Sequence, residues 1–264
     1  MRGSIPSPGP STKLYGGNTS CVHVRCGDEH LIFDLGTGVR ALGDTLGPGP
    51  LRATIFLSHY HYDHLQGLPF FTPMFDPANA FTLYGPEREG QGVREILGGQ
   101  MVQPYFPVSA ENAFRAQIDY RHIVAEHALA VGEAQVRTIA LNHPGGTLGY
   151  RVDYRGRSLV YATDIEHGTV TDVRLTELSR GADLLIYDAM YTPAEYEGAH
   201  GKRGWGHSTW EAGVRVANAA EVKTLMLFHH DPARDDRSLT RLLAQVRRKR
   251  RATVAAKERE VIRL

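Results

Sequence analysis

The sequence predicts an α/β layered sandwich, in which helices pack outside β-sheets. Three observations predict it: apolar β-rich runs alternate with helical stretches along the whole chain, the helical stretches carry apolar stripes, and no proline- or serine-rich linker, repeat or low-complexity tract interrupts them. The chain has 264 residues, 42% hydrophobic and 22% charged, which excludes disorder, collagen and coiled coil. We therefore expect a single domain over residues 1–264, or two intimate halves.

The predicted strands are short apolar runs bounded by turn residues. Several are apolar enough to be buried on both faces, which is typical of parallel sheets. In chain order they are 20–25, 31–34, 54–58, 81–84, 135–141, 149–154, 158–163, 184–188 and 224–228.

The predicted helices are amphipathic, so each has one face that can lie on a sheet. The apolar stripe of the fourth is formed by Trp210, Val214, Ala217 and Ala220. In chain order the helices are 38–45, 87–97, 172–180, 209–219 and 238–250.

Net charge and hydropathy limit the classes of partner that the chain can bind. Thirty Lys and Arg residues oppose 29 Asp and Glu, and a net charge of +1 gives no global attraction for polyanions. The apolar runs are far shorter than the ~20 residues of a membrane helix, and the N-terminal residues lack the apolar segment of a secretory signal. We therefore expect a cytoplasmic chain with no membrane partner, and the sequence leaves a homodimer open.

Three of the thirteen histidines lie with one aspartate in the loop after strand 54–58. They are His59, His61, Asp63 and His64. A strand that ends in this way delivers imidazoles and a carboxylate to one loop, where two can face one cation and two its neighbour. A polar surface loop with chance histidines is the alternative, but these residue types rarely coincide at this spacing outside metal sites. The loop therefore predicts a metal site.

These four residues match without departure the His-x-His-x-Asp-His signature of the metallo-β-lactamase superfamily, and the chain resembles that superfamily from Tyr15 to His229. The resemblance implies a four-layer αβ/βα sandwich, which agrees with the order of elements. It also implies that His143, after strand 135–141, is the third histidine ligand and that Asp164, after strand 158–163, bridges the metals.

The last implied ligand follows strand 224–228, where His229 and His230 compete. We favour His229 because it is the first residue after the strand. An isolated histidine or aspartate after a strand is more often a capping or turn residue. The assignment of these ligands therefore depends on each of them following an apolar strand in the order that the superfamily requires.

The resemblance as a whole implies a dinuclear site without thiolate ligands. Nitrogen and oxygen donors suit two divalent metal ions, with zinc first and manganese or iron as alternatives. Asp63 or Asp164 would also orient the attacking water. One metal would be held by His59, His61 and His143, the other by Asp63, His64 and His229, with Asp164 between them.

Gly-His-Ser-Thr at 206–209 begins a predicted helix, where Ser208 or Thr209 can cap the helix and backbone N–H groups can hold an anion. The segment resembles that of the ribonuclease Z branch, which implies that His207 contacts the scissile phosphate and protonates the leaving oxygen. Asp188 takes the place of that branch's glutamate, a departure in side-chain length. The alternative is that His207 only orders its loop.

One insertion of bacterial ribonuclease Z enzymes is missing. In the bacterial enzymes of the branch that this chain resembles, an arm that binds tRNA lies between the third histidine and the bridging aspartate. Here residues 144–163 are filled by two predicted strands and their turn, so no tRNA exosite fits. The basic run 247–251 either binds nucleic acid or is the solvated end of an amphipathic helix, which we favour because cations complement the helix dipole there.

We therefore expect a dinuclear metal-dependent hydrolase, a phosphodiesterase acting on a small, cyclic or related nucleotide. The stretch 103–108, rich in proline and aromatic residues, either stacks a nucleobase or is a packed loop. Two other functions stay open: a lactonase or thioesterase of the same fold, and a metal-bearing sensing module without turnover. Only the His207 segment separates the first of these from a phosphodiesterase.

Overall fold

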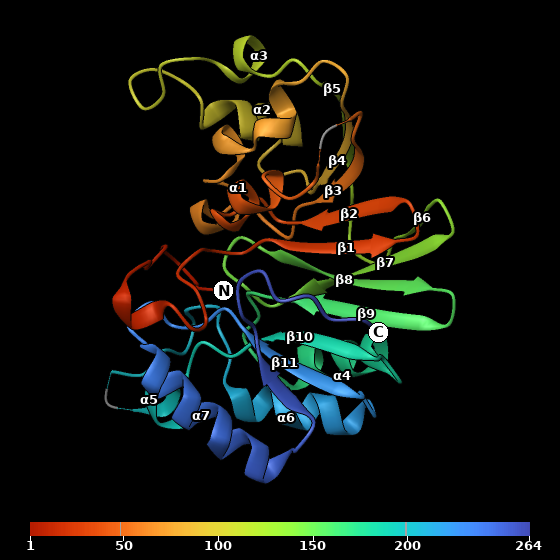
Figure 1. Cartoon of the computed structure of the whole chain (residues 1–264). Helices are drawn as coiled ribbons and strands as arrows, with labels where there is room; N and C mark the ends of the chain where they lie inside the picture. The colour runs from red at the N-terminus through yellow and green to blue at the C-terminus, as the bar shows by residue number, and fades with distance from the viewer. Residues whose placement is uncertain (48, 199) are drawn as a thin grey trace. The chain divides into compact units, whose positions relative to one another are not determined.

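The computed structural model describes residues 1–47, 49–198 and 200–264 (Figure 1). The chain forms two compact units. Unit 1 comprises Met1–Asn18 and Ala125–Leu264, and unit 2 comprises Thr19–Val124. Within the described ranges, no helix is long and apolar enough to span a membrane.

Unit 2 is built on a five-stranded sheet in the order β1-β2-β3-β4-β5. β1 and β2 form an antiparallel hairpin, and the other neighbours are parallel. The elements are β1 (Val22–Cys26), β2 (Glu29–Phe33), α1 (Gly38–Gly43), β3 (Arg52–Phe56), η2 (Tyr62–His64), η3 (Leu68–Phe70), η4 (Thr72–Phe75), β4 (Ala80–Gly85), α2 (Val93–Gly99), α3 (Ala110–Ala113) and β5 (Gln117–His122).

The core of unit 2 follows from the alternation of side chains along its strands. In β4, Phe81 and Leu83 are buried while their neighbours are half-buried. Both belong to a cluster that includes Val39 of α1 and Leu97 of α2, so these helices cover one face of the sheet. The sheet in turn fixes the loop that follows β3.

Unit 1 is built on a seven-stranded sheet in the order β12-β11-β10-β9-β8-β7-β6. β9 to β12 are parallel and β6 to β9 antiparallel. The elements are η1 (Pro10–Thr12), β6 (Ala128–Val131), β7 (Ala134–Leu141), β8 (Thr147–Tyr154), β9 (Arg157–Ala162), α4 (Thr169–Ser179), β10 (Leu184–Asp188), α5 (Pro193–Glu197), α6 (Trp210–Ala219), β11 (Thr224–Phe228), α7 (Asp236–Lys249) and β12 (Thr253–Ala255).

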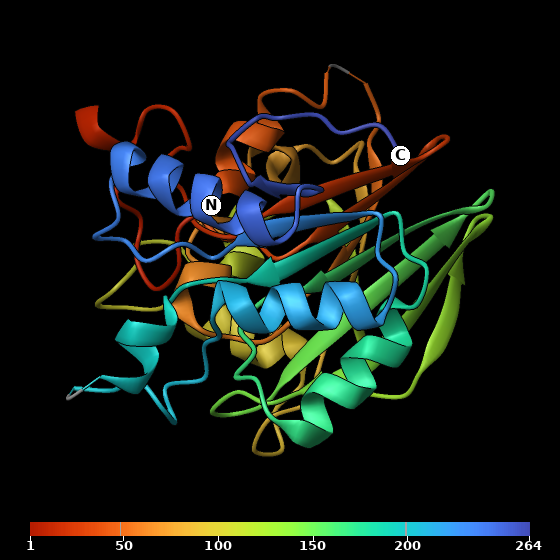
Figure 2. The same cartoon turned by 90° about the horizontal axis from the view of Figure 1, so that it is seen from below.

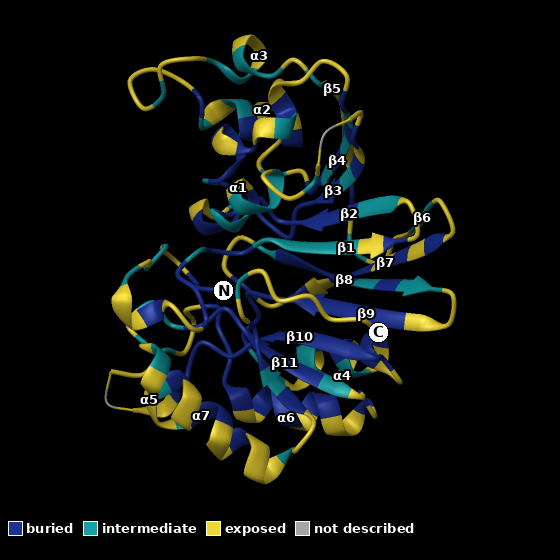
Figure 3. Ribbon diagram, viewed as in Figure 1, coloured by how far each residue is buried: buried dark blue, intermediate teal, exposed yellow. Residues whose placement is uncertain are grey.

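Helices α4 and α6 lie side by side across the strands of unit 1 (Figure 2). The predicted stripe of α6 is buried, with Trp210 only 2% exposed. Every residue of β10 is buried, and the helices show one buried and one exposed face (Figure 3). The basic run predicted at a helix end lies there, since Arg247 is in the last turn of α7 and donates to the Thr253 carbonyl at 2.8 Å.

The elements depart from the predicted ones mainly at the edges of the sheets. β5, β6 and β12, which no sequence pattern predicted, are all edge strands, and β5 alternates exposed and half-buried residues. An edge strand has one partner and a short or polar sequence, so its apolar signal is weak. The helix predicted from residue 87 begins at Val93, because Glu89 and Gly90 have positive φ.

Candidate metal centre

In unit 2 the donors lie in the loop after β3 and in the short helix η2. The loop after β2 holds them, since Leu35 N–H donates to the His64 carbonyl at 2.7 Å and Gly67 N–H donates to the Leu35 carbonyl at 2.9 Å. Gly36 has no room for a side chain, because a Cβ there would collide with the carbonyl oxygen of Asp63. Two backbone loops therefore fix the donors.

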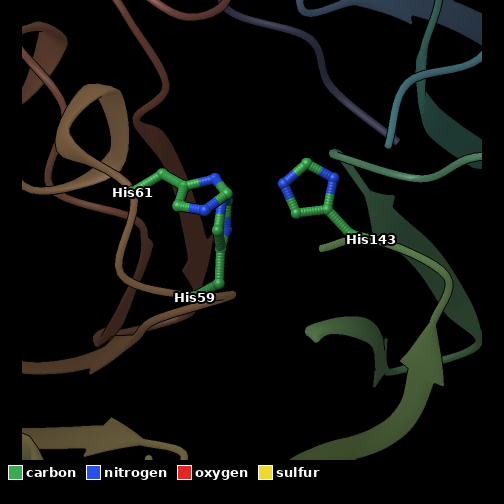
Figure 4. A group of neighbouring side chains, drawn as sticks. All are labelled: His59, His61 and His143. Carbon is green, nitrogen blue, oxygen red and sulfur yellow. The ribbon is translucent and has the colours of Figure 1, made fainter. Parts of the chain in front are cut away.

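The imidazoles of this loop are in mutual contact. The ring centroids of His59 and His61 (Figure 4) are 4.5 Å apart at 79°. Those of His59 and His64 are 4.3 Å apart. Nε2 of His64 lies 3.2 Å from a carboxylate oxygen of Asp63. His59, Asp63 and His64 are buried and His61 is exposed. His143, the third side chain drawn in Figure 4, belongs to unit 1.

Asp34, the residue after β2, anchors two of these histidines. Its carboxylate accepts from Nδ1 of His64 at 2.8 Å, from the backbone N–H of Ser58 at 2.7 Å and from the Ser58 hydroxyl at 2.8 Å. The Ser58 oxygen lies 3.0 Å from Nδ1 of His59. Because a carboxylate only accepts, Nδ1 carries the proton in both rings and Nε2 keeps a lone pair.

In unit 1 the donors come from the ends of strands of one sheet. His143 follows β7, Asp164 follows β9, Asp188 ends β10 and His229 follows β11. The parallel strands β9, β10 and β11 bring their carboxyl ends to one edge, where α/β proteins place their sites. Single donor atoms of Asp164, Asp188, His207 and His229 all lie within 4.8 Å of one another.

Asp164 is at the middle of this group. One carboxylate oxygen lies 3.3 Å from Nε2 of His229, and the other lies 3.9 Å from Nε2 of His143 and 3.8 Å from Nδ1 of His207. The Thr163 hydroxyl donates to Asp164 at 2.7 Å. Such a set of buried carboxylate and imidazole groups is costly without a cation, and it suits a divalent metal ion.

The backbone is unusual at two of the donors and at the anchor Asp34. Asp34, Asp164 and His229 have φ of 61°, 51° and 55°, in the left-handed region that few residues other than glycine adopt. Gly3 lies against the His229 ring so closely that a Cβ would collide with it. Residues held in this conformation concentrate at functional sites, where packing enforces it.

His229 and His230, which compete in the sequence, have different surroundings. The part of the chain that the structure describes contains a donor group with His229 and Asp164, and none with His230. His230 is fully buried, its ring meets the edge of Tyr15, and neither ring nitrogen has a hydrogen-bond partner among the described residues. Burial, followed by the positive charges of the N-terminus and Arg2, lowers the pKa of His230.

His207 and Asp188 form a pair. Nδ1 of His207 lies 2.8 Å from a carboxylate oxygen of Asp188, whose other oxygen accepts from the Met190 backbone N–H at 3.0 Å. The His207 ring stacks on His229 with centroids 4.9 Å apart at 22°. The shorter aspartate therefore still reaches the histidine.

The start of α6 fixes the segment that carries His207. Thr209 is the N-cap and accepts from the Ala212 N–H at 3.2 Å. The Ser208 hydroxyl instead contacts Tyr187 at 2.8 Å and Nδ1 of His167 at 3.0 Å. Of the two residues that the sequence offered as caps, the structure uses Thr209.

Two residues of the site were missed at the level of the sequence. Asp34 ends an apolar strand just as Asp164 does, and that pattern could have identified it. Glu166 has no such signal. It is buried, and although burial opposes ionisation, hydrogen bonds from Gly204, Tyr196 and Gly206 hold its pKa below the ordinary value.

The aromatic stretch 103–108 in unit 2 is half packed. Phe106 meets the edge of Phe70 with centroids 6.2 Å apart, whereas Tyr105 is 85% exposed. Tyr62, between two donors of the loop, is 78% exposed. Exposed aromatic rings are therefore present on the unit that carries the His59 loop.

Comparison with known proteins places the chain among enzymes. Residues 31–230 match the model of the beta-lactamase superfamily domain. The chain is 26% identical to ribonuclease Z of Pyrococcus furiosus, with 81% of each chain covered. It is 27% identical to ribonuclease BN of Citrobacter koseri, over 81% of this chain and 82% of that one.

A solved structure shows the same fold. The metallo-beta-lactamase fold protein YhfI from Bacillus subtilis superposes with a TM-score of 0.71 at 17% identity, over 98% of this chain and 95% of that one. The predicted α/β fold class is therefore confirmed, and the ribonuclease relatives confirm the resemblance to the ribonuclease Z branch.

Proposed function

Because the chain belongs to the beta-lactamase superfamily, we propose that this metal-dependent hydrolase is a dinuclear phosphodiesterase acting on a small, cyclic or related nucleotide. The relatives named ribonuclease Z and ribonuclease BN support the reaction class, since the links between the nucleotides of RNA are phosphodiesters. The single observation that carries the proposal is the hydrogen-bonded pair of His207 and Asp188 beside Asp164.

The donors present fit divalent metal ions. In His59, His64 and His143, hydrogen bonds to Nδ1 leave Nε2 as the coordinating atom, which is the usual arrangement of a metal-bound histidine. When bound, the ions supply Lewis acidity that neutralises phosphoryl charge and makes water a nucleophile near neutral pH. The proposed ligands are His59, His61, Asp63, His64, His143, Asp164 and His229.

Zinc is our first choice for both ions, because nitrogen and carboxylate donors without thiolate suit it, and manganese or iron are the alternatives. Asp63 or Asp164 orients the attacking water. Neither carboxylate needs to change its protonation state for that role, so it can be held ionised throughout the reaction.

His207 acts as the general acid. The Asp188 carboxylate accepts its Nδ1 proton, fixes the ring and stabilises an imidazolium, so Nε2 can give a proton to the departing oxygen. A diester with a poor leaving group needs this proton, whereas an activated aryl diester does not. This requirement separates a phosphodiesterase with a general acid from a site in which His207 only orders its loop.

Two features support a small substrate over a long RNA. The residues between His143 and Asp164 form β8, β9 and their turn, which leaves no length for an inserted RNA-binding arm. The net charge of +1 provides no general attraction for a polyanion. The exposed Tyr105 is available to stack on a nucleobase, as aromatic side chains do at nucleotide sites.

The experiment combines metal analysis with a substrate panel. Purified protein is analysed by inductively coupled plasma mass spectrometry, then assayed with bis-p-nitrophenyl phosphate, 2′,3′- and 3′,5′-cyclic nucleotides, and lactones. We expect two metal equivalents and turnover of a cyclic nucleotide. Two metals with cleavage of lactones but not of diesters would overturn the substrate class, and two metals with no turnover would indicate a binding module.

Substitution of the acid tests the assignment of His207. His207→Ala should leave metal content intact and lower turnover on an alkyl diester by about 10²- to 10⁴-fold, the usual contribution of a general acid. Asp188→Asn should act in the same direction with a smaller effect. An equal loss on bis-p-nitrophenyl phosphate, whose leaving group needs no proton, would contradict the acid role.

A further inference from the structure

The buried carboxylate of Glu166 binds the segment of the chain that precedes His207, through Tyr196, Gly204 and Gly206. One of its oxygens accepts from the Tyr196 hydroxyl at 2.7 Å and from the Gly204 N–H at 2.7 Å, and the other accepts from the Gly206 N–H at 2.9 Å. Glu166 is 8% exposed. The carboxylate is therefore held by neutral donors of this segment.

The segment leads directly to two side chains of the site. The Gly206 carbonyl accepts from Nδ1 of His143 at 2.7 Å, and the next residue is His207. Gly206 has φ of 82°, and a Cβ there would collide with His143 and Pro144. Any displacement of the Gly206 peptide is therefore transmitted to both histidines.

Glu166 is itself fixed to the strand end that carries His143. Its N–H donates to the Asn142 carbonyl at 2.7 Å, and the Asn142 amide donates back to the Glu166 carbonyl at 3.2 Å. The contacts form a closed ring: Asn142 is bound to Glu166, Glu166 to Gly206, and Gly206 to His143. A closed ring of buried hydrogen bonds holds its members more tightly than separate bonds do.

We propose that Glu166 is a positioning residue that orients His143 and His207 together by holding the Gly206 peptide. The part concerning His207 rests on the proposed function, whereas the part concerning His143 does not. Glu166 touches neither substrate nor reacting atoms in this role. Its carboxylate sets the direction of Nε2 in one metal ligand and the position of the acid that follows.

The test replaces the acceptor without changing its size. In Glu166→Gln one acceptor oxygen becomes an amide NH₂, which faces the backbone N–H of Gly204 or of Gly206 in either orientation and cannot accept from it. We expect zinc affinity of the metal-free protein, measured by chelator competition, to fall by about 10- to 100-fold, as for other residues that orient metal ligands. At saturating zinc, kcat should fall more on an alkyl diester than on bis-p-nitrophenyl phosphate.

The matched control makes the same substitution in the same part of the chain. Glu197→Gln removes an exposed ion pair with Arg203, and we expect wild-type zinc affinity and turnover. Tyr196→Phe removes one of the three donors and should give a smaller shift in the direction of Glu166→Gln. Near-ultraviolet circular dichroism verifies the fold; if Glu166→Gln is unfolded, Tyr196→Phe carries the test.

The outcomes separate this inference from the proposed function. Wild-type zinc affinity and wild-type leaving-group dependence in a folded Glu166→Gln would overturn it, as would losses no larger than those of Glu197→Gln. If the wild-type protein cleaves no diester, the proposed function fails, and zinc affinity alone still decides whether Glu166 orients His143. Restoration of zinc affinity by Glu166→Asp, which keeps both acceptor oxygens, would support the role of the carboxylate.

Discussion

The two units hold the side chains that we propose as metal ligands in different ways. Unit 2 supplies four donors from the single stretch of residues 59–64, and one carboxylate, Asp34, supports His59 and His64. Unit 1 collects its donors from the ends of β7, β9 and β11, which are far apart in the chain, and gives each its own support. Spacing along the chain thus determines one set, and strand order in the sheet determines the other.

This difference predicts how far the effect of one substitution spreads among the donors of each unit. In unit 2 the loss of one anchor should disturb several ligands together, because they share it. In unit 1 the loss of one donor should be local, because His143 is held by Gly206, Asp164 by Thr163 and His229 by packing against Gly3. The following substitutions compare the two arrangements.

The largest effect is expected in unit 1. His229→Ala should remove one metal equivalent and lower turnover by at least about 10²-fold, since a ligand matters more than a residue that orients one. His230→Phe should leave the metal content unchanged. Its free energy of unfolding should be unchanged or higher by about 1 kcal/mol, because a buried ring without hydrogen bonds among the described residues is replaced by an apolar one. The measurements are metal content and chemical denaturation.

This pair decides between the two adjacent histidines. Loss of a metal in His230→Phe together with retention in His229→Ala would reverse the assignment. Loss in both variants would mean that the backbone of the loop after β11, and not one ring, controls the site.

A smaller effect is expected when the shared anchor of unit 2 is changed. Asp34→Asn should weaken zinc binding by about 10- to 100-fold, because the amide cannot accept from Nδ1 of His64 and from Ser58 in the same way. Ser58→Ala removes the contact to His59 and the hydroxyl bond to Asp34 but leaves the bond between Asp34 and His64, so it should cost less. Equal losses in the two variants, measured by chelator competition, would show that Asp34 is no shared anchor.

The last prediction concerns stability, and a histidine pair of unit 2 that lies away from the donors. Nε2 of His23 lies 3.0 Å from Nδ1 of His30, and their rings stack 5.0 Å apart. Burial, then His30 and Arg25, lowers the pKa of His23 from 6.5 to about 4. Above pH 6.5 both the folded and the unfolded protein carry a neutral His23, so this group adds no pH dependence there.

Between pH 6.5 and about pH 4, His23 is protonated in the unfolded chain and neutral in the folded chain. The free energy of unfolding therefore falls as the pH falls through this window. We expect metal-free wild-type protein to lose about 2 kcal/mol from this source between pH 7 and 4.5, and His23→Phe to lose correspondingly less. Denaturation at both pH values measures it. Parallel pH profiles of the two proteins would contradict the prediction.

The sequence predicted the strands that form the middle of each sheet and the edge strand β1, and it missed the other edge strands β5, β6 and β12. β10 and β11 are buried and apolar, so their patterns are strong, whereas β6 and β12 are short and have a single neighbour. The boundaries of α2 were missed because the turn before it depends on backbone conformation, which residue type only partly determines.

The same physical reasons apply to the site. The loop with His59, His61 and His64 was predicted from spacing alone, because consecutive donors share one loop in any fold. Glu166 could not be predicted, because its partners Gly204 and Gly206 contribute backbone N–H groups that leave no trace in residue type. Whether all seven proposed ligands act together, and whether residues 1–264 form a single domain, stay predictions.

Two glycines of the segment before His207 differ in their freedom to change. Gly204 and Gly206 both have positive φ, but a Cβ at Gly204 would meet nothing within 4 Å, whereas one at Gly206 would collide with His143. Every amino-acid replacement at Gly206 adds that Cβ, so none of them leaves the contact with His143 unchanged. At Gly204, asparagine or aspartate can adopt the same backbone conformation. We therefore expect natural sequence variation in this segment to include substitutions at Gly204 and to exclude substitutions at Gly206.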